Sequence, residues 1–138
     1  MAIKQLSVFI ENKQGKLSDA IKVVAEAGIN MRAMSIADTN DFGILRLIVS
    51  DIAKAKEVLS EDTVVNVTDV IAVKMNDKEG ALYNILKVLE EANINIEYTY
   101  AFTTHEVGAY VVFRVGDVAA AEKALTDKGF ELATEADI

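Results

Sequence analysis

The sequence predicts an α+β protein made of two similar units, each with the element order β-α-β-β-α-β. Three observations predict this fold: an internal repeat, apolar residues that alternate between strand-like and helix-like periods, and two closely similar polar loops. The loops read ENKQGKL at residues 11–17 and NDKEGAL at residues 76–82. Each loop separates an apolar strand-like run from an amphipathic segment, so we expect one architecture to occur twice.

The repeat is clear when the sequence is shifted by 65 positions, which aligns residues 11–50 with residues 76–115 and gives 11 identities. Average composition predicts roughly two or three identities by chance over such a span. After a one-residue gap, residues 51–53 align with residues 117–119. We therefore predict a tandem duplication, with one unit at 1–68 and the other at 69–138.

The first strand and helix of each unit follow from apolar spacing. Residues 3–10 alternate as a strand does, whereas the apolar residues of 17–27 recur at i, i+3, i+4 and i+7, as on one face of a helix. Gly28 follows and predicts a left-handed helix stop. The segment 82–92 repeats the helical stripe, and Asn93 takes the place of the glycine.

The remaining elements are a hairpin, a second helix and a closing strand in each unit. Hairpins are expected at 30–38 with 43–50, turning at Thr39–Phe42, and at 96–103 with 107–115, turning at Thr104–Glu106. Short helices are expected at 53–60 and 118–128, and closing strands at 64–70 and 130–136. This order is the ferredoxin-like arrangement, an antiparallel sheet with helices on one face.

Composition excludes several classes of function. The chain carries 22 acidic and 14 basic residues, a net charge of −8, without a basic cluster, so nucleic acid and an anionic membrane are not expected partners. The absence of cysteine excludes disulfides, thiolate metal sites and thiol catalysis. No apolar run approaches the roughly 20 residues that span a bilayer, and no signal-peptide pattern occurs, so we expect a cytoplasmic protein. Neither a cofactor nor a metal is expected.

The repeated loop has two interpretations. It joins the end of a strand to the start of a helix, where unpaired backbone N–H groups and the helix dipole favour a carboxylate or phosphate. Alternatively, Asn12 and Asp77 cap or turn the chain while Gly15 and Gly80 ease its bend. A phosphate-binding P-loop does not fit, because Leu17 stands where that motif has Ser or Thr.

Two other groups of residues each have more than one possible role. His105 is the only histidine and falls at the expected tip of a hairpin, where a solvated residue is more common than a metal ligand or a catalytic group. Tyr98 and Tyr100 share one face of a strand. They could line a pocket for a ligand's side chain, but packing in a core or an interface is the more frequent role of such a pair.

A family resemblance rests on the ordered set of these features. A strand, a polar loop ending in Gly-x-Leu, an amphipathic helix and then EAGIN or EANIN at the next strand resemble the ACT domain, twice over and across essentially the whole chain. Together with the stretch SIADTNDFGILRLIV, the layout resembles small free-standing tandem ACT proteins. The resemblance implies a non-enzymatic regulatory module that binds an amino acid where two ACT units meet, and it makes a homodimer and a metabolic enzyme partner plausible expectations.

The resemblance also implies which residues bind the ligand: those of the two loops and those that open the second strand of each unit. They are Asn12, Lys13, Gln14, Gly15, Lys16, Leu17, Asn30 and Met31 in the first unit and Asp77, Lys78, Glu79, Gly80, Ala81, Leu82, Asn95 and Ile96 in the second. The sequence departs from the family where many ACT loops carry proline before the glycine, since Gln14 and Glu79 stand there. Ile10-Glu11-Asn12 also differs from the His-Glu-Asn of serine-sensing members, and the acidic Asp77 and Glu79 suggest that the two sites are unequal.

Two alternatives to an amino-acid sensor stay open. The first is a structural or dimerising protein whose ligand sites have degenerated, because sheet edges are natural surfaces for association. The second is an enzyme similar to acylphosphatases, which share the fold class. That chemistry needs an arginine in the phosphate-binding loop, and neither repeated loop contains one.

Overall fold

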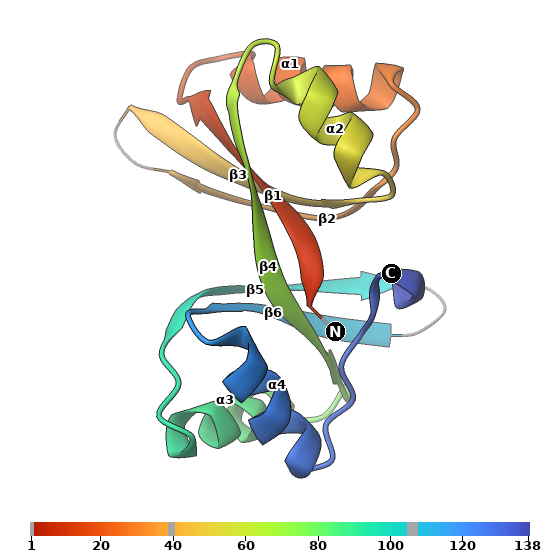
Figure 1. The fold of residues 1–138 in the computed structure, drawn as a ribbon. Helices are drawn as coiled ribbons and strands as arrows, with labels where there is room; N and C mark the ends of the chain where they lie inside the picture. Colours follow the sequence, from red (N-terminus) through yellow and green to blue (C-terminus); the bar gives the residue numbers. More distant parts are fainter. Residues whose placement is uncertain (1, 39–40, 105–107) are drawn as a thin grey trace. The chain divides into compact units, whose positions relative to one another are not determined.

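The structure is a computed structural model that describes residues 2–38, 41–104 and 108–138. The chain divides into two compact units, which we call the N-terminal unit (Lys4–Thr68) and the C-terminal unit (Asp69–Ile138, which also takes in Ile3). In each unit the helices lie on one face of the sheet (Figure 1). The predicted α+β, ferredoxin-like class is therefore confirmed for both units.

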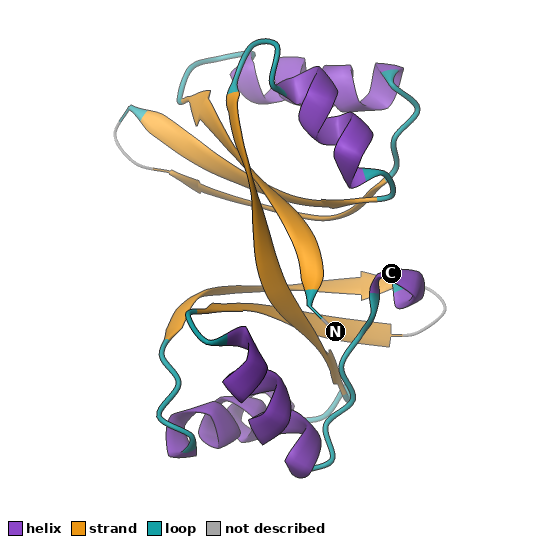
Figure 2. Ribbon diagram, viewed as in Figure 1, coloured by secondary structure: helices purple, strands orange, loops and turns teal. Residues whose placement is uncertain are grey.

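The N-terminal unit follows the predicted order closely. It comprises strand β1 (Ile3–Glu11), helix α1 (Lys16–Glu26), strands β2 (Met31–Asp38) and β3 (Phe42–Val49), helix α2 (Ile52–Leu59) and the first part of strand β4 (Val64–Met75). Its strands lie in the order β2-β3-β1-β4, and β3 pairs antiparallel with both β1 and β2. Figure 2 shows the two helices packed over this sheet.

The core of the N-terminal unit lies between the sheet and these helices. Alternate residues of β1, namely Leu6, Val8 and Ile10, point to the helices and are almost fully buried. They meet the apolar stripe of α1, where Ala20 and Val24 are buried. The strand period of two and the helix period of 3.6 thus bring one apolar face of each element into the same core.

The C-terminal unit repeats the arrangement. After β4 come helix α3 (Ala81–Glu91), strands β5 (Ile96–Thr104) and β6 (Gly108–Val115) and helix α4 (Val118–Asp127). Strand β6 pairs antiparallel with both β4 and β5. A core cluster built on Phe113, Ile85 and Leu125 joins the sheet to both helices.

The closing strand predicted at 130–136 is wrong in its extent. Only Leu132 forms a β-bridge, to Val73, and the chain then turns into a short 3-10 helix, Glu135–Asp137. The carboxylate of Asp137 accepts hydrogen bonds from the backbone N–H and the hydroxyl of Thr134, at 2.8 and 3.0 Å. These local bonds offer the backbone an alternative to a sheet ladder, which explains why the strand stops early.

The run 64–75, which contains neither Gly nor Pro, forms one continuous strand, β4. The strand predicted to end near residue 70 therefore passes directly into the first strand of the next unit, as the sequence led us to expect.

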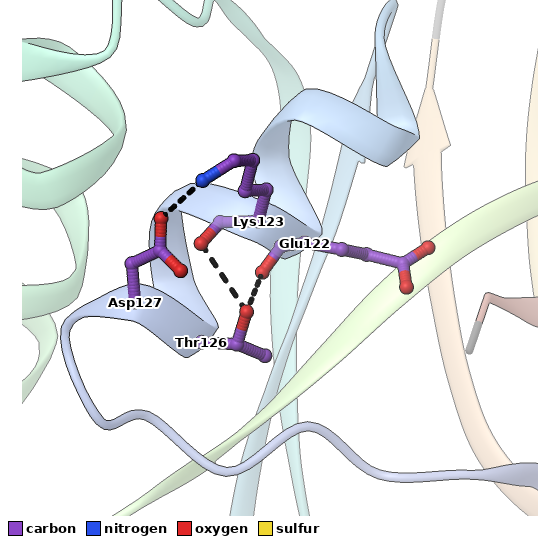
Figure 3. Close-up of polar contacts among 4 residues, drawn as sticks. All are labelled: Glu122, Lys123, Thr126 and Asp127. Carbon is purple, nitrogen blue, oxygen red and sulfur yellow. Dashed lines mark hydrogen bonds and ion pairs between the residues drawn. The ribbon is translucent and has the colours of Figure 1, made fainter.

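The charged residues of α4 lie on its exposed side, where Lys123 pairs with Asp127 at 2.6 Å and the Thr126 hydroxyl donates to the Glu122 carbonyl oxygen at 2.8 Å (Figure 3). Among the described residues, no helix has both the length and the apolar character needed to span a bilayer.

The helix stops agree with prediction. Gly28 has φ +73° and Asn93 has φ +58°, so both end their helices in the left-handed conformation. A Cβ atom added at Gly28 would have no atom within 4 Å, so backbone strain alone limits the residue at this place. The amide of Gly28 donates to the Ala25 carbonyl at 3.0 Å, and that of Asn93 donates to the Glu90 carbonyl at 3.0 Å.

We predict that Gly28→Ala lowers the free energy of unfolding by about 1–2 kcal/mol, because alanine is strained at a positive φ. Gly28→Asn, the residue that the second repeat uses, should cost less. Urea unfolding of the purified variants measures both values. Equal costs for the two substitutions would contradict this account of the helix stop.

Candidate functional site

The first repeated loop is a tight turn that places a glycine directly before α1. The Lys16 amide donates to the Lys13 carbonyl at 3.2 Å, and Gly15 has φ +86° and ψ −13°. Because Asn93 is the only non-glycine residue with positive φ in the described chain, Gln14 has a negative φ. These angles and this hydrogen bond define a type II turn, which requires glycine at its third position.

The second loop reproduces the first bond by bond. The Ala81 amide donates to the Lys78 carbonyl at 3.2 Å, and Gly80 has φ +81° and ψ −1°. The amides of Lys13 and Lys78 each donate to the carbonyl two residues before them, both at 2.9 Å. The sequence repeat is therefore also a repeat of backbone geometry.

This turn leaves donors at the start of the helix. Gly15 is the N-cap of α1, and no side chain forms a capping hydrogen bond there. The Lys16 amide is bonded to the turn and the Asp19 amide to the Gly15 carbonyl. Leu17 and Ser18 thus hold the N2 and N3 amides, one of which an N-cap side chain normally satisfies.

Of the two roles that the alternative interpretation predicted for Asn12 and Asp77, to cap or to turn the chain, capping is wrong, because the turn places Gly15 and Gly80 at the N-cap positions. A glycine has no side-chain oxygen to offer. Asn12 and Asp77 both lie in bends that precede the helices. The second part of that interpretation, that the glycines ease the bend, is confirmed by their positive φ angles. The helix start of each unit therefore has no side-chain cap.

Charges surround the first turn. Lys13 Nζ lies 3.0 Å from the Glu11 carboxylate, and both side chains are exposed. The hydrogen bond and the charge of Lys13, together with the charge of Lys16, lower the pKa of Glu11 from its ordinary value. In the second unit Asn76 replaces Glu11 and Ala81 replaces Lys16, so the equivalent positions are neutral.

The strand-opening asparagines lie at the far ends of the same helices. Both Asn30 and Asn95 are exposed. The backbone of Asn30 is bonded to Ser50, whose hydroxyl accepts from the Asn30 amide at 3.0 Å and whose amide donates to the Asn30 carbonyl at 2.9 Å. Gly116 follows β6 as Ser50 follows β3, and a glycine has no hydroxyl to offer Asn95.

Met31 and Ile96 follow these asparagines, and both are half-buried at the start of an irregular strand pairing. Helix α1 has 11 residues and is therefore about 16 Å long. The turn at Gly15 and the asparagine at 30 lie at its opposite ends, too far apart to hold one amino acid together. Each unit by itself thus offers either the turn or the asparagine to a ligand.

A cleft of about 500 Å³ opens beside the first turn, within the N-terminal unit. Apolar side chains from the strands, the helices and the start of β4 line it, with charged groups added from α1, the end of β1 and the loop after α2. The lining residues are Phe9, Ile10, Glu11, Lys16, Asp19, Ala20, Val23, Phe42, Val58, Leu59, Asp62, Thr63 and Val64.

The C-terminal unit has a smaller cleft of about 150 Å³ at the corresponding place, beside its own turn. Its lining residues are Lys74, Met75, Asn76, Lys78, Glu79, Ala81, Asn84, Ile85 and Phe130. Lys16, Lys78, Glu79 and Ala81 are thus the residues predicted from sequence that line a cleft. Sequence reasoning missed the apolar walls of the clefts. The repeat alignment held one signal of them, because it places the small Ala20 opposite the larger Ile85.

Tyr98 and Tyr100 lie on the sheet face opposite the core of the C-terminal unit, half-buried, in a row with Phe102. The ring of Phe102 stacks on Tyr110 with centroids 5.4 Å apart. The row lies outside both clefts. His105 lies outside the described residues, and the described part of the chain holds no cluster of three acidic, histidine or cysteine residues suited to a metal.

We predict that Gln14→Pro and Glu79→Pro each raise the free energy of unfolding by about 0.4–1 kcal/mol. Proline suits the second position of a type II turn, and it restricts the unfolded chain. Denaturant unfolding measures the gain, with Lys13→Pro as the control, because the Lys13 amide donates a hydrogen bond that proline would remove. Destabilisation by Gln14→Pro would show that the turn has another geometry.

We also predict that Lys13→Ala raises the pKa of Glu11 toward its ordinary value, because the principal partner of the carboxylate is removed. A lowered carboxyl pKa stabilises the folded state above the ordinary carboxyl range, and this contribution is lost as pH falls through the lowered value. An NMR titration of the Glu11 carboxyl group measures the shift. Lys22→Ala, which removes the partner of Glu26, should leave Glu11 unchanged.

The whole chain, residues 1–138, matches the family model of the ACT domain pair. Protein BT0572 from Bacteroides thetaiotaomicron is similar in sequence and fold, with 39% identity, coverage of 99% of this chain and 95% of that chain, and a TM-score of 0.91. A comparison with curated proteins gave no match.

Two regulatory subunits of aspartate kinase share the fold at lower identity. The subunit from Thermus thermophilus is 16% identical, with 91% of this chain and 92% of that chain covered and a TM-score of 0.65. The subunit from Thermus flavus is 18% identical, with 90% of each chain covered and a TM-score of 0.61. With the family model matched from end to end, the chain belongs to the ACT domain pair family.

Proposed function

We propose that this protein is a non-enzymatic regulatory module that binds an amino acid at its strand-to-helix turns and signals to a metabolic enzyme. The observation that supports this most directly is the pair of type II turns with glycine N-caps. Each turn presents two backbone amides at the positive end of a helix dipole, the arrangement that suits a carboxylate.

The rest of an amino acid needs acceptors for its ammonium group. Asparagine side-chain oxygens and backbone carbonyls meet this need, and Asn30 and Asn95 are exposed at the strand openings. Because a turn and an asparagine of one unit lie at opposite ends of a helix, a site that uses both takes them from different ACT units. The proposed ligand residues are therefore the turn and strand-opening positions predicted from the sequence.

The similar structures support a regulatory role. The Thermus proteins are regulatory subunits of aspartate kinase by name, and their likeness to this chain is one of fold. We extend from them only the general role of a regulatory subunit that acts on an enzyme. A homodimer belongs to the same proposal.

A second candidate is a dimerising protein without a ligand. It is favoured by Met34 and Ile36, which are 42% and 46% exposed on β2, a strand at the edge of its sheet. Exposed apolar residues on an edge strand are suited to association. An acylphosphatase-like enzyme has less support, because neither turn contains the arginine that such chemistry needs.

Thermal unfolding with each common amino acid at millimolar concentration tests the proposal. A ligand that binds only the native state stabilises it by about 2.7 kcal/mol at a hundredfold excess over its Kd, so a clear rise in Tm is expected with one or a few related amino acids. If the first turn binds the amino acid, Gly15→Val should abolish the rise in Tm. If the second turn binds it, Gly80→Val should abolish the rise.

Gly28→Val is the matched control. Gly28 also has a positive φ and open space around it, but it lies at the opposite end of α1. It should lower the starting Tm as the turn variants do and leave the response to ligand intact. An absence of any rise with all amino acids would favour the dimerising protein instead.

A further inference from the structure

We propose that the N-terminal unit binds amino acids with large apolar side chains and that the C-terminal unit does not. The inference rests on the proposed function and deepens it by naming the class of ligand and the unit that holds its side chain. It is carried by the two clefts beside the turns, which occupy equivalent places in the repeat and differ in size and charge.

The difference in size has an identifiable cause. The repeat alignment pairs Ala20 with Ile85 and, beyond the one-residue gap, Val64 with Phe130. All four residues line their respective clefts. The larger side chains of the C-terminal unit fill space that stays open in the N-terminal unit, where the cleft measures about 500 Å³ against about 150 Å³.

Only the larger cleft falls within the range of about 300–1,000 Å³ that is typical of small-molecule sites. Its walls include Phe9, Phe42 and Val64, which remain 40%, 53% and 64% exposed. An apolar side chain placed there would cover these groups and remove apolar surface from water. The cleft is therefore suited to more than the backbone of an amino acid.

The charges at the cleft select a zwitterion. Lys16 lies at the start of α1, beside the free-amide end of the helix, and can attract a carboxylate. Asp19 and Asp62 line the same cleft and can attract an ammonium group, whereas Glu11, the third carboxylate of the lining, pairs with Lys13 at 3.0 Å. In the second repeat Ala81 and Asn84 replace Lys16 and Asp19, and the charged residues that line the smaller cleft are instead Lys74, Lys78 and Glu79.

The combination of an apolar floor with one cation and three carboxylates at its edge, of which Glu11 is paired with Lys13, favours a free amino acid over a fatty acid or a nucleotide. A fatty acid has no group for the aspartates, and a nucleotide would need more cations than Lys16. Amino acids with small side chains would meet the same charges and leave the apolar walls exposed. Leucine and phenylalanine are accordingly the probes of choice.

Calorimetric titration of the full chain with L-alanine, L-leucine and L-phenylalanine tests the inference. We expect leucine or phenylalanine to bind about tenfold or more tightly than alanine, because several buried carbon atoms are added. Val64→Phe, which copies the second repeat at an exposed position, should remove this preference by lowering the affinity for leucine and phenylalanine to about that for alanine. Ala20→Val narrows the floor of the same cleft and should act in the same direction.

Val67→Phe is the matched control, since Val67 is also an exposed valine of β4 but does not line the cleft. It should preserve the preference for large side chains. Equal affinity for alanine and leucine in the unchanged protein, or a preference that survives both cleft variants, would overturn the inference while leaving amino-acid binding in place. Failure of every amino acid to bind would remove the proposed function and this inference with it.

Discussion

The turn at Gly15 and its copy at Gly80 are the constraint on which the rest of the site depends. A left-handed residue is required at the third position of each type II turn, and glycine adopts that conformation without strain. The same glycine becomes the N-cap of the following helix, where it can provide no side-chain acceptor. One backbone requirement thus both redirects the chain from strand to helix and leaves the helix start without a side-chain cap.

Duplication preserved this backbone while the side chains around it diverged. The two turns share the same hydrogen bonds and nearly the same glycine angles. At the aligned positions around the turns, the N-terminal unit has Ala20 and Lys16 where the C-terminal unit has Ile85 and Ala81. The two clefts differ in size and in charged lining residues. Backbone geometry is retained because the fold needs it, whereas residues beside a cleft are free to specialise for a ligand or to fill the space.

Most of the fold could be predicted because its signals are local. Apolar periods, helix stops at Gly28 and Asn93 and the run without Gly or Pro in β4 each act within a few residues. The prediction of a closing strand at 130–136 was wrong in its extent because hydrogen bonds from Thr134 to the Asp137 carboxylate compete with the sheet, and apolar spacing does not reveal them. The walls of the clefts could not be predicted either, because Phe9, Val23 and Val64 meet only in three dimensions.

The central claim is that the amides exposed by the glycine turn hold the ligand's carboxylate. An amide NMR titration with L-leucine tests it at the atoms concerned, because each backbone N–H gives its own resonance. The account predicts that the amides of Leu17 and Ser18 shift saturably and by the same Kd as the calorimetric titration. A saturable response elsewhere in the chain, with these amides and those of Leu82 and Tyr83 unmoved, would contradict it.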